Sequence, residues 1–359
     1  MKEQILVSIN CITFNHESYI RECLEGFLKQ KTNFVFEVLI HDDASTDNTA
    51  NIIREYEKKY PEIIKPIYQT ENQYSKGVRV SRVFNFPRAK GKYIAMCEGD
   101  DYWIDPLKLQ KQVDFLEKNE EYGMVHTNFD TYYQNSNYFL KNTHSVYNIN
   151  LKDDCSLEYW NLFGKAMATI KTLTVCFRRD LINECRSVTP ENKWLIGDFP
   201  NYFYISLHSK IGYINESTSV YRTVPNGSAS NVGNDNKKKL NIKKTYVDIR
   251  LHFFDKYKLD EKTFKKALIR EFNLLFDYCI LSDNESILNE YLEILTLLKW
   301  QHNASRLSRI YLKSNSPTKK LILQYGTKIK LFVLTYFIKF FNRKILIAAL
   351  QRKLKYRNV

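Results

Sequence analysis

Several features that the sequence lacks already narrow the class of protein. Its 359 residues include seven cysteines, an odd number with no Cys-x-x-Cys pair, which argues against a disulfide framework and favours reduced thiols. No run reaches the roughly 18 apolar residues of a membrane-spanning helix, because the nearest candidate, Leu331 to Ile338, is bounded by Lys330 and Lys339. The first residues lack the apolar stretch of a signal peptide, so we expect a cytoplasmic chain.

Acidic residues are missing from the C-terminal segment. Residues 301–359 contain fourteen Lys/Arg and no Asp/Glu, so the net charge of +14 resides there and the first 300 residues are balanced. Between Lys319 and Arg357 the cations interrupt aliphatic runs on a roughly helical period. Two interpretations stay open: helices that lie on an anionic membrane surface, and a packed helix with a solvated basic face. The long aliphatic runs argue against nucleic-acid binding.

Apolar runs alternate with helical patterns in the first hundred residues. Runs typical of buried strands lie at 5–12, 34–40, 63–68 and 93–97, and helical spacing occurs at 18–30 and around Ile52 to Tyr56. This order predicts an α/β fold with a mostly parallel central sheet and helices on both faces. Ligands of such sheets bind at the carboxyl ends of the strands.

Acidic residues cluster at two of these strand ends. Asp42 and Asp43 follow the second strand, and Glu98, Asp100 and Asp101 follow the fourth. Carboxylates this close repel one another unless a cation lies between them, and hard oxygen ligands suit Mg²⁺ or Mn²⁺. A solvated loop that caps the next helix is the alternative, but Asp105 before Pro106 already supplies a cap there.

Three segments in this order carry a family resemblance: VSINCITFNHESYIRECLEGFLKQ, FEVLIHDDASTDNT and AKGKYIAMCEGDD. They resemble the successive signatures of bacterial family 2 glycosyltransferases, which are inverting enzymes with a Rossmann-like, A-type fold. The resemblance covers residues 4–130 and weakens through about 225. It implies transfer of a sugar from a nucleoside diphosphate sugar, such as a UDP-sugar, with Mn²⁺ or Mg²⁺ as cofactor.

The resemblance also implies roles for particular residues. Thr13 and Asn15 would line the nucleotide base site, and Asp42 or Asp43 would hold the uracil or the ribose. Glu98 and Asp100 occupy the two acidic positions of an Asp-x-Asp motif, with Asp100 the direct metal ligand. Glu98 departs from the usual aspartate, so its carboxylate either reaches the metal, directly or through water, or contacts the ribose. Asp101 would orient the donor sugar or a neighbouring loop.

An inverting transfer needs a base that takes the proton from the acceptor hydroxyl. By resemblance this base is Asp198, at the start of a helix whose N-terminus would keep the carboxylate ionised, although the same pattern describes an ordinary N-cap. Asp153 and Asp154 are competing candidates for the base. Arg222 ends a strand and is a candidate ligand of the leaving diphosphate. Trp103 and Trp194 flank these motifs and are candidates for stacking on an acceptor sugar, whereas burial in the core is the commoner fate of tryptophan.

These observations together predict two domains: a nucleotide-sugar-binding domain at 1–226 and a helical region at 227–359, basic and a candidate for membrane contact from about 301. The predicted function is a metal-dependent inverting transfer to a glycan or lipid-linked acceptor in surface polysaccharide assembly, at the inner face of the cell membrane. A non-catalytic nucleotide-sugar-binding or scaffold protein is the alternative. A nucleotidyltransferase is disfavoured because SINCITFNHESY lacks a glycine-rich phosphate loop.

Overall fold

The computed structural model describes residues 4–146, 170–190, 194, 196–223, 235–298, 323–324, 327–328 and 330–331. The chain divides into two compact units, Met1–Ser228 and Ala229–Val359. The boundary expected near residue 226 falls within 224–234, outside the described residues. Each unit is described by itself below.

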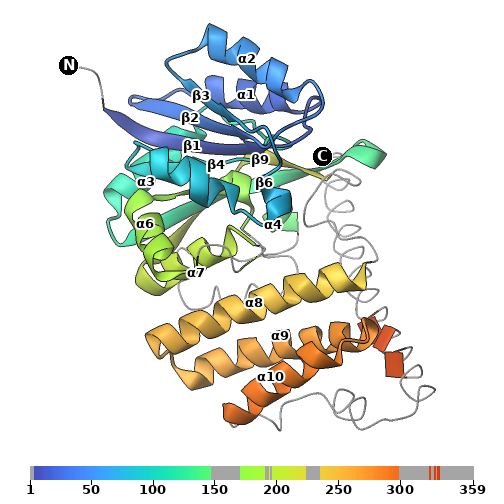
Figure 1. The fold of residues 1–359 in the computed structure, drawn as a ribbon. Coiled ribbons are helices and arrows are strands. Elements are labelled where there is room, and N and C mark those ends of the chain that lie inside the picture. Colours follow the sequence, from blue (N-terminus) through green and yellow to red (C-terminus); the bar gives the residue numbers. More distant parts are fainter. Residues whose placement is uncertain are drawn as a thin grey trace, which may run out of the picture. The chain divides into compact units, whose positions relative to one another are not determined.

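The first unit is built on one nine-stranded sheet with the order β3-β2-β1-β4-β8-β6-β9-β5, and β7 pairs with β6 at the side (Figure 1). Its strands are β1 (Ile5–Thr13), β2 (Val35–Asp42), β3 (Ile64–Tyr68), β4 (Tyr93–Met96), β5 (Tyr102–Trp103), β6 (Tyr122–Tyr133), β7 (Tyr138–Leu140), β8 (Val175–Arg178) and β9 (Lys210–Thr223). The four strands predicted from the first hundred residues are therefore present, with ends shifted by one or two residues.

The sheet is parallel in its first half and mixed beyond it. Strands β1 to β4 pair in parallel, so their carboxyl ends meet at one edge. Strand β8 then pairs antiparallel with both β4 and β6, while β6 and β9 pair in parallel. The expected fold class is confirmed, but the sheet is mixed rather than mostly parallel. The parallel pattern could be predicted only where helices separate the strands.

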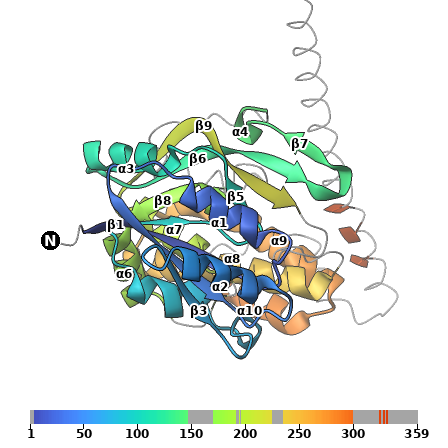
Figure 2. The ribbon, with the colours of Figure 1, turned by 90° about the horizontal axis from the view of Figure 1, so that it is seen from above.

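Helices cover both faces of this sheet, as predicted. They are α1 (Ile20–Leu28), α2 (Thr49–Lys59), α3 (Lys108–Lys118), α4 (Thr143–Val146), α6 (Arg179–Val188) and α7 (Phe199–His208). Apolar residues of α1, α2 and α3 pack with Tyr93 and Ala95 of β4, whereas α6 and α7 pack with Ile94 and Met96. Because strand side chains alternate between faces, β4 is buried on both sides. Figure 2 shows α1 and α2 side by side.

The start of α3 differs from the prediction. The helix begins at Lys108, and its N-cap position is Leu107, without a side-chain cap bond. Asp105 instead accepts the backbone N–H of Leu107 at 2.9 Å and the ammonium of Lys111 at 2.8 Å. The aspartate therefore stabilises a turn before the helix, which is the local bonding habit that makes Asp frequent in both places.

The second unit contains α8 (Asn236–Tyr257), α9 (Glu261–Leu281) and α10 (Glu285–Leu297), which pack as consecutive helices (Figure 1). In the described part of the chain, no helix has the length and apolar character needed to cross a membrane. Of the basic segment 301–359, only six residues are described, and Lys330 among them donates to Asp277 of α9 at 2.6 Å. The expected amphipathic helices therefore lie outside the described residues.

Candidate functional site

The acidic loop, defined as residues 98–101, leaves the carboxyl end of β4 and packs on the end of β1. The backbone N–H of Gly99 donates to the carbonyl of Ile12 at 3.0 Å. A Cβ atom on Gly99 would lie 2.7 Å from Thr13 Oγ1 and 2.9 Å from Thr13 Cβ. Only glycine therefore permits this close approach, which turns the flanking carboxylates toward one another.

The three acidic side chains of the loop converge on one place. Carboxylate oxygens of Glu98, Asp100 and Asp101 all lie within 4.8 Å of one another. Burial and, after it, the charges of Asp100 and Asp198 together raise the pKa of Glu98 to about 8. Burial also raises the pKa of Asp101 well above its usual range, with Asp100 as the second cause. The residues fit a hard divalent cation, because they present oxygen ligands whose mutual repulsion such an ion would relieve.

A lysine that no sequence pattern predicted lies within electrostatic reach of this acidic loop. Lys171 precedes β8, and its ammonium lies 4.0 Å from the ring centroid of Tyr221 on β9. Burial lowers the pKa of Lys171, while the charges of Asp101, Asp198 and Glu98 favour the protonated form. No motif marks this residue, because only the pairing of β8 between β4 and β6 brings residue 171 beside residues 98–101.

Asp198 lies at the N-cap of α7, as predicted, and belongs to the same electrostatic group. Its Oδ1 accepts the backbone N–H of Phe199 at 2.7 Å. Burial raises the pKa of Asp198, whereas this hydrogen bond and Lys171 lower it. The expectation that the helix terminus alone would keep the carboxylate ionised therefore left out the cost of burial. The competing aspartates, Asp153 and Asp154, lie outside the described residues.

Asp42 and His16 connect the acidic loop to the ends of β1 and β2. Thr13 and Asp42 are register partners in the sheet, and Asp42 accepts the hydroxyl of Ser45 at 2.5 Å. Burial lowers the pKa of His16, while the charges of Asp100, Asp47 and Asp42 raise it. His16 therefore lies within electrostatic reach of both acidic clusters, Asp42–Asp43 and the acidic loop.

Two of the expected nucleotide-binding residues make structural contacts. Asp43 accepts the backbone N–H groups of Gln73 at 2.8 Å and Tyr74 at 2.9 Å, and also contacts His41 Nε2 at 3.3 Å. Asn15 adopts a φ of 55° and accepts the backbone N–H of Thr46 at 2.8 Å through Oδ1. Of the two aspartates left open, Asp42 is therefore the one with fewer of its acceptor sites used by the fold.

Arg222 lies beside the acidic loop, but its guanidinium already has hydrogen-bond partners within the protein. Its Nε donates to the backbone oxygen of Asp100 at 2.8 Å, and its Nη2 donates to Glu22 at 2.5 Å. Its backbone N–H donates to Asp101 Oδ1 at 2.7 Å. The side chain is 8% exposed. The arrangement does not offer a free guanidinium to a diphosphate, which was the role expected for Arg222.

The two tryptophans expected to stack on an acceptor sugar are buried. Trp103 is 3% exposed, packs edge-on against Phe27 with centroids 4.8 Å apart, and donates its indole N–H to the carbonyl of Leu173 at 3.0 Å. Trp194 is 2% exposed, and the guanidinium of Arg79 lies 5.8 Å from its ring centroid. Both rings are core residues here and present no open face to a sugar.

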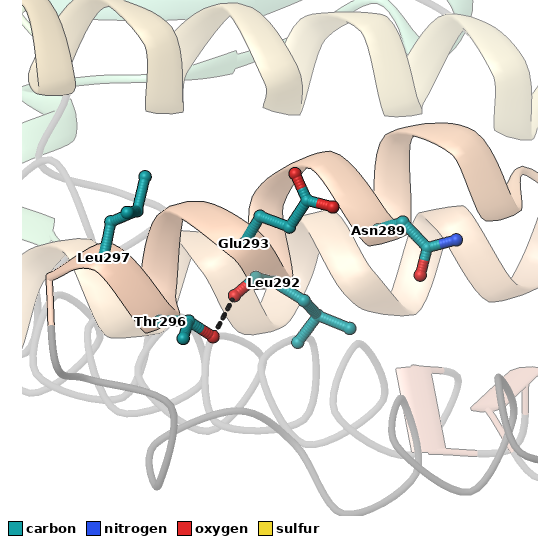
Figure 3. A pocket seen from close by; sticks show the side chains of 5 residues that line it. All are labelled: Asn289, Leu292, Glu293, Thr296 and Leu297. Atoms are coloured by element: carbon teal, nitrogen blue, oxygen red, sulfur yellow. Dashed lines mark hydrogen bonds between the residues drawn. The ribbon is translucent and has the colours of Figure 1, made fainter.

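The second unit has a hollow of about 450 Å³ that is unrelated in composition to the acidic loop. Figure 3 shows that its lining residues all come from α10: Asn289, Leu292, Glu293, Thr296 and Leu297. Thr296 Oγ1 donates to the backbone oxygen of Leu292 at 2.9 Å. The lining holds a single carboxylate, so it lacks the convergent ligand set found at 98–101.

Comparison with known proteins identifies what this site resembles. Residues 8–183 match the model of a family described as glycosyl transferase family 2. This segment contains the acidic loop and Lys171, but it ends before Asp198 and Arg222. The family match therefore covers the strands and the loop that build the acidic centre.

Curated relatives align over the same region. An uncharacterized protein of Mycobacterium tuberculosis is 50% identical over 115 residues, which make up 32% of each chain. The Escherichia coli enzyme WfaP, a UDP-Glc:alpha-D-GlcNAc-diphosphoundecaprenol beta-1,3-glucosyltransferase, is 32% identical over 136 residues, or 38% of this chain and 47% of WfaP. The similarity thus spans a third to a half of the length of these relatives.

A solved structure shares the fold over a longer stretch. Staphylococcus aureus TarS, residues 1–349 in complex with UDP-GlcNAc, superposes with a TM-score of 0.54 and 17% identity. The superposition covers 76% of this chain and 73% of the TarS chain. At this level of identity the likeness establishes the A-type glycosyltransferase fold.

Proposed function

Because residues 8–183 form a family 2 glycosyltransferase domain, we propose that the chain transfers a sugar from a nucleoside diphosphate sugar to a glycan or lipid-linked acceptor. One observation carries the proposal: the carboxylates of Glu98, Asp100 and Asp101 converge at the carboxyl edge of the sheet, within electrostatic reach of Asp198. Acidic groups in a solvated loop would not be held so close together that their pKa values rise. We therefore expect a cationic ligand between them.

The nucleotide would lie between the two acidic strand ends. The carboxylate of Asp42, at the end of β2, accepts the hydroxyl and the backbone N–H of Ser45 at 2.5 and 3.4 Å. With fewer donors than Asp43, it is the better candidate for the ribose or the uracil. Thr13 lies at the end of β1, with its buried Oγ1 lacking a hydrogen-bond partner in the structure. An orphaned hydroxyl at this edge is suited to a ligand hydrogen bond. UDP is the nucleotide expected from the resemblance.

Asp100 and Glu98 would hold Mn²⁺ or Mg²⁺, with Asp101 oriented by its bond to the Arg222 backbone. When bound, such an ion supplies positive charge that stabilises the departing diphosphate. Lys171 adds a further positive charge on the same side, because its ammonium faces Asp101, Asp198 and Glu98. The departing diphosphate would therefore be stabilised by the positive charges of the divalent ion and Lys171.

Asp198 would take the proton from the acceptor hydroxyl as its oxygen attacks the anomeric carbon. Its position at the N-cap of α7 gives it one fixed hydrogen bond through Oδ1, which leaves the second oxygen to orient the nucleophile. Attack from this side of the sugar, opposite the diphosphate, would invert the anomeric configuration. The raised pKa caused by burial makes Asp198 a stronger base than an exposed aspartate.

The decisive experiment measures donor hydrolysis and transfer by the full chain across a panel of nucleotide sugars, with Mn²⁺, Mg²⁺ or a chelator. A thermal-shift screen with each donor and metal identifies the nucleotide first. We expect turnover only with divalent metal, and its loss in Asp100→Ala. Substantial turnover in chelator would refute the metal-dependent mechanism. UDP binding without turnover of any donor would instead favour the non-catalytic nucleotide-sugar-binding protein.

We further propose a role in surface polysaccharide assembly on the cytoplasmic side of the cell membrane. The name of WfaP specifies a lipid-linked acceptor, alpha-D-GlcNAc-diphosphoundecaprenol. The basic segment at 301–359 has the positive charge needed to contact an anionic bilayer. Flotation of the full chain with vesicles that contain 30% anionic phospholipid tests this contact. Equal flotation with neutral vesicles would argue against the electrostatic part of the proposal.

A further inference from the structure

Arg222, near the end of β9, connects the acidic loop to helix α1. Its side chain donates to the backbone oxygen of Asp100 at 2.8 Å and to Glu22 of α1 at 2.5 Å, while its backbone N–H donates to the carboxylate of Asp101 at 2.7 Å. One residue therefore fixes both the main chain of Asp100 and the side chain of Asp101. The bonds to carboxylates are charged or buried, which makes them stronger than ordinary surface contacts.

Three tyrosine rings surround the guanidinium of Arg222. Its Cζ lies 4.9 Å from the ring centroid of Tyr19, 5.1 Å from Tyr102 and 5.5 Å from Tyr132. These rings come from the residue before α1, from β5 and from β6. We call this arrangement the arginine cage. Cation–π contacts at a site removed from water are stronger than exposed ones, so the cage helps to hold the guanidinium in place.

The sheet explains why Arg222 can reach the loop. Strand β9 pairs with β6, with Arg222 opposite Tyr132, and it also pairs antiparallel with β5, with Val220 opposite Tyr102. The short strand β5 begins directly after Asp101. The end of β9 is therefore held against the acidic loop from two sides, and the position of Arg222 is set by the sheet rather than by the loop.

We infer that Arg222 is a positioning residue that sets the geometry of the acidic centre, rather than a ligand of the donor diphosphate. Its donors are directed at Asp100 and Glu22, and its side chain is 8% exposed. Without the arginine side chain, the backbone oxygen of Asp100 would lose its anchor, whereas the bond from the backbone N–H of residue 222 to Asp101 would remain. Residues that orient metal ligands in this way typically change metal affinity by about 10- to 100-fold when they are removed.

The expected effect of Arg222 on metal affinity rests on the proposed metal-binding function. The claim that Arg222 anchors the acidic loop can be tested without metal. The test compares Arg222→Met with Arg178→Met in the full chain. Arg178 is a matched control, because it donates to the backbone oxygens of Tyr122 and Leu116 at 2.8 and 2.7 Å and lies over the ring of Tyr93 at 5.6 Å. It makes comparable contacts, but with none of the residues assigned to the site.

Two measurements are made on each variant. The first is the affinity for Mn²⁺ alone, from electron paramagnetic resonance of free Mn²⁺. The second is hydrogen exchange of the metal-free protein at residues 97–103, where the amides of Gly99 and Asp101 are bonded to Ile12 and Glu98. We expect Arg222→Met to weaken Mn²⁺ binding at least tenfold and to accelerate exchange at this loop. Arg178→Met should change neither, even if it lowers the melting temperature as much.

The possible outcomes separate the inference from the proposed function. Unchanged Mn²⁺ affinity and loop exchange in Arg222→Met, with weaker UDP binding, would overturn the inference and make Arg222 a diphosphate ligand. Equal effects of both variants would overturn it in favour of general destabilisation. If the wild-type protein binds no Mn²⁺, the metal proposal fails, while loop exchange still decides whether Arg222 holds the acidic loop.

Arg222→Lys keeps the test decisive if Arg222→Met does not fold. A lysine retains the charge inside the arginine cage, but its single ammonium cannot replace the planar fork that bonds Asp100 and Glu22 together. We expect a loss of Mn²⁺ affinity of about threefold and faster hydrogen exchange at residues 97–103 than in the wild-type protein. Wild-type values for both measurements would show that charge alone is required, which contradicts positioning through the Asp100 backbone.

Discussion

The two acidic clusters of the first unit, Asp42–Asp43 and the acidic loop, look alike in the sequence and differ in the structure. Asp43 at the end of β2 accepts two backbone N–H groups and contacts His41, so the fold itself uses this carboxylate. Glu98 and Asp100, after β4, face each other and Asp101 instead. Carboxylates that the fold supplies with donors are structural, whereas carboxylates that mainly face one another need an external cation.

The largest expected effect is on the base. Asp198→Asn should lower kcat about 10²- to 10⁴-fold, because an amide cannot accept the proton of the acceptor hydroxyl. Asparagine is as good an N-cap as aspartate, so its carbonyl can keep the bond to Phe199 and the fold is preserved. Steady-state kinetics with the donor found in the screen, together with UDP affinity, separate chemistry from binding.

Asp198→Ala is the control for this prediction, because it removes the cap as well as the base. It should lose activity to the same extent and about 1 kcal/mol of stability in addition. Transfer by Asp198→Asn within threefold of the wild-type rate would show that Asp198 is only a cap. The base would then have to be sought elsewhere, and Asp153 and Asp154 would be the next candidates.

The contrast between carboxylates that the fold uses and carboxylates that it leaves for a ligand predicts opposite phenotypes for the neighbouring residues Asp43 and Asp42. Asp43→Asn should reduce the free energy of unfolding by about 2 kcal/mol, because a neutral amide weakens two bonds from backbone N–H groups. Asp42→Asn is the matched control, with a smaller loss of stability and UDP binding weakened about tenfold. Urea unfolding and UDP titration measure both quantities. A larger loss of UDP binding in Asp43→Asn would exchange the two roles.

The sequence predicted the first half of the fold and the members of the acidic loop. Strands β1 to β4 are separated by helices of clear period, and Glu98, Asp100 and Asp101 are adjacent in the chain, so local patterns were sufficient. Lys171 and the arginine cage could not be found in this way. They depend on β8 and β9 entering a mixed sheet, where partners are set by pairings between residues up to 200 positions apart, as for Arg222 and Glu22.

The fate of the tryptophans shows the same limit. Trp103 lies two residues beyond the acidic loop, yet strand alternation turns its ring into the core against Phe27. Nearness in sequence to a motif therefore did not predict nearness of the side chain to the site. Asp43 is similar, because its partners at Gln73 and Tyr74 lie about thirty residues away in a stretch without regular pattern.

Two lysines, one buried in the core and one near the acidic loop, extend the comparison to cations. Lys108 is fully buried and donates to Gln112 Oε1 at 2.9 Å and to the carbonyl of Thr174 at 3.2 Å. Burial lowers its pKa from 10.5 to about 7. The unfolded chain therefore binds more protons than the folded one between pH 7 and 10.5, and stability due to this group rises with pH in that window.

Lys108→Met should remove this pH dependence. Relative to the variant, the wild-type protein should gain about 2 kcal/mol of unfolding free energy between pH 7 and 9. Urea unfolding at both pH values measures the difference. Lys111→Met is the control, because Lys111 is partly exposed and paired with Asp105 and Glu216, which raise its pKa and leave it protonated throughout the window. Equal slopes for wild type and Lys108→Met would show that Lys108 stays charged in the core.

The smallest expected effect belongs to Lys171, the cation that faces the acidic loop. Its ammonium is held over Tyr221 and interacts with Asp101, Asp198 and Glu98, so it balances part of their charge in the metal-free protein. A divalent ion in the loop would be repelled by it. Lys171→Met should therefore raise the affinity for Mn²⁺ about threefold while lowering the stability of the metal-free protein.

The same Mn²⁺ titration by electron paramagnetic resonance measures this change, and thermal unfolding in chelator measures the loss of stability. The control is Lys210→Met, a substitution at the start of β9, where the ammonium lies 5.7 Å from the ring of Tyr122. Weaker Mn²⁺ binding in Lys171→Met would mean that the ammonium orients the ligands instead of competing for them. The acidic loop would then resemble Asp43, because the geometry of its carboxylates would depend on a donor that the fold already provides.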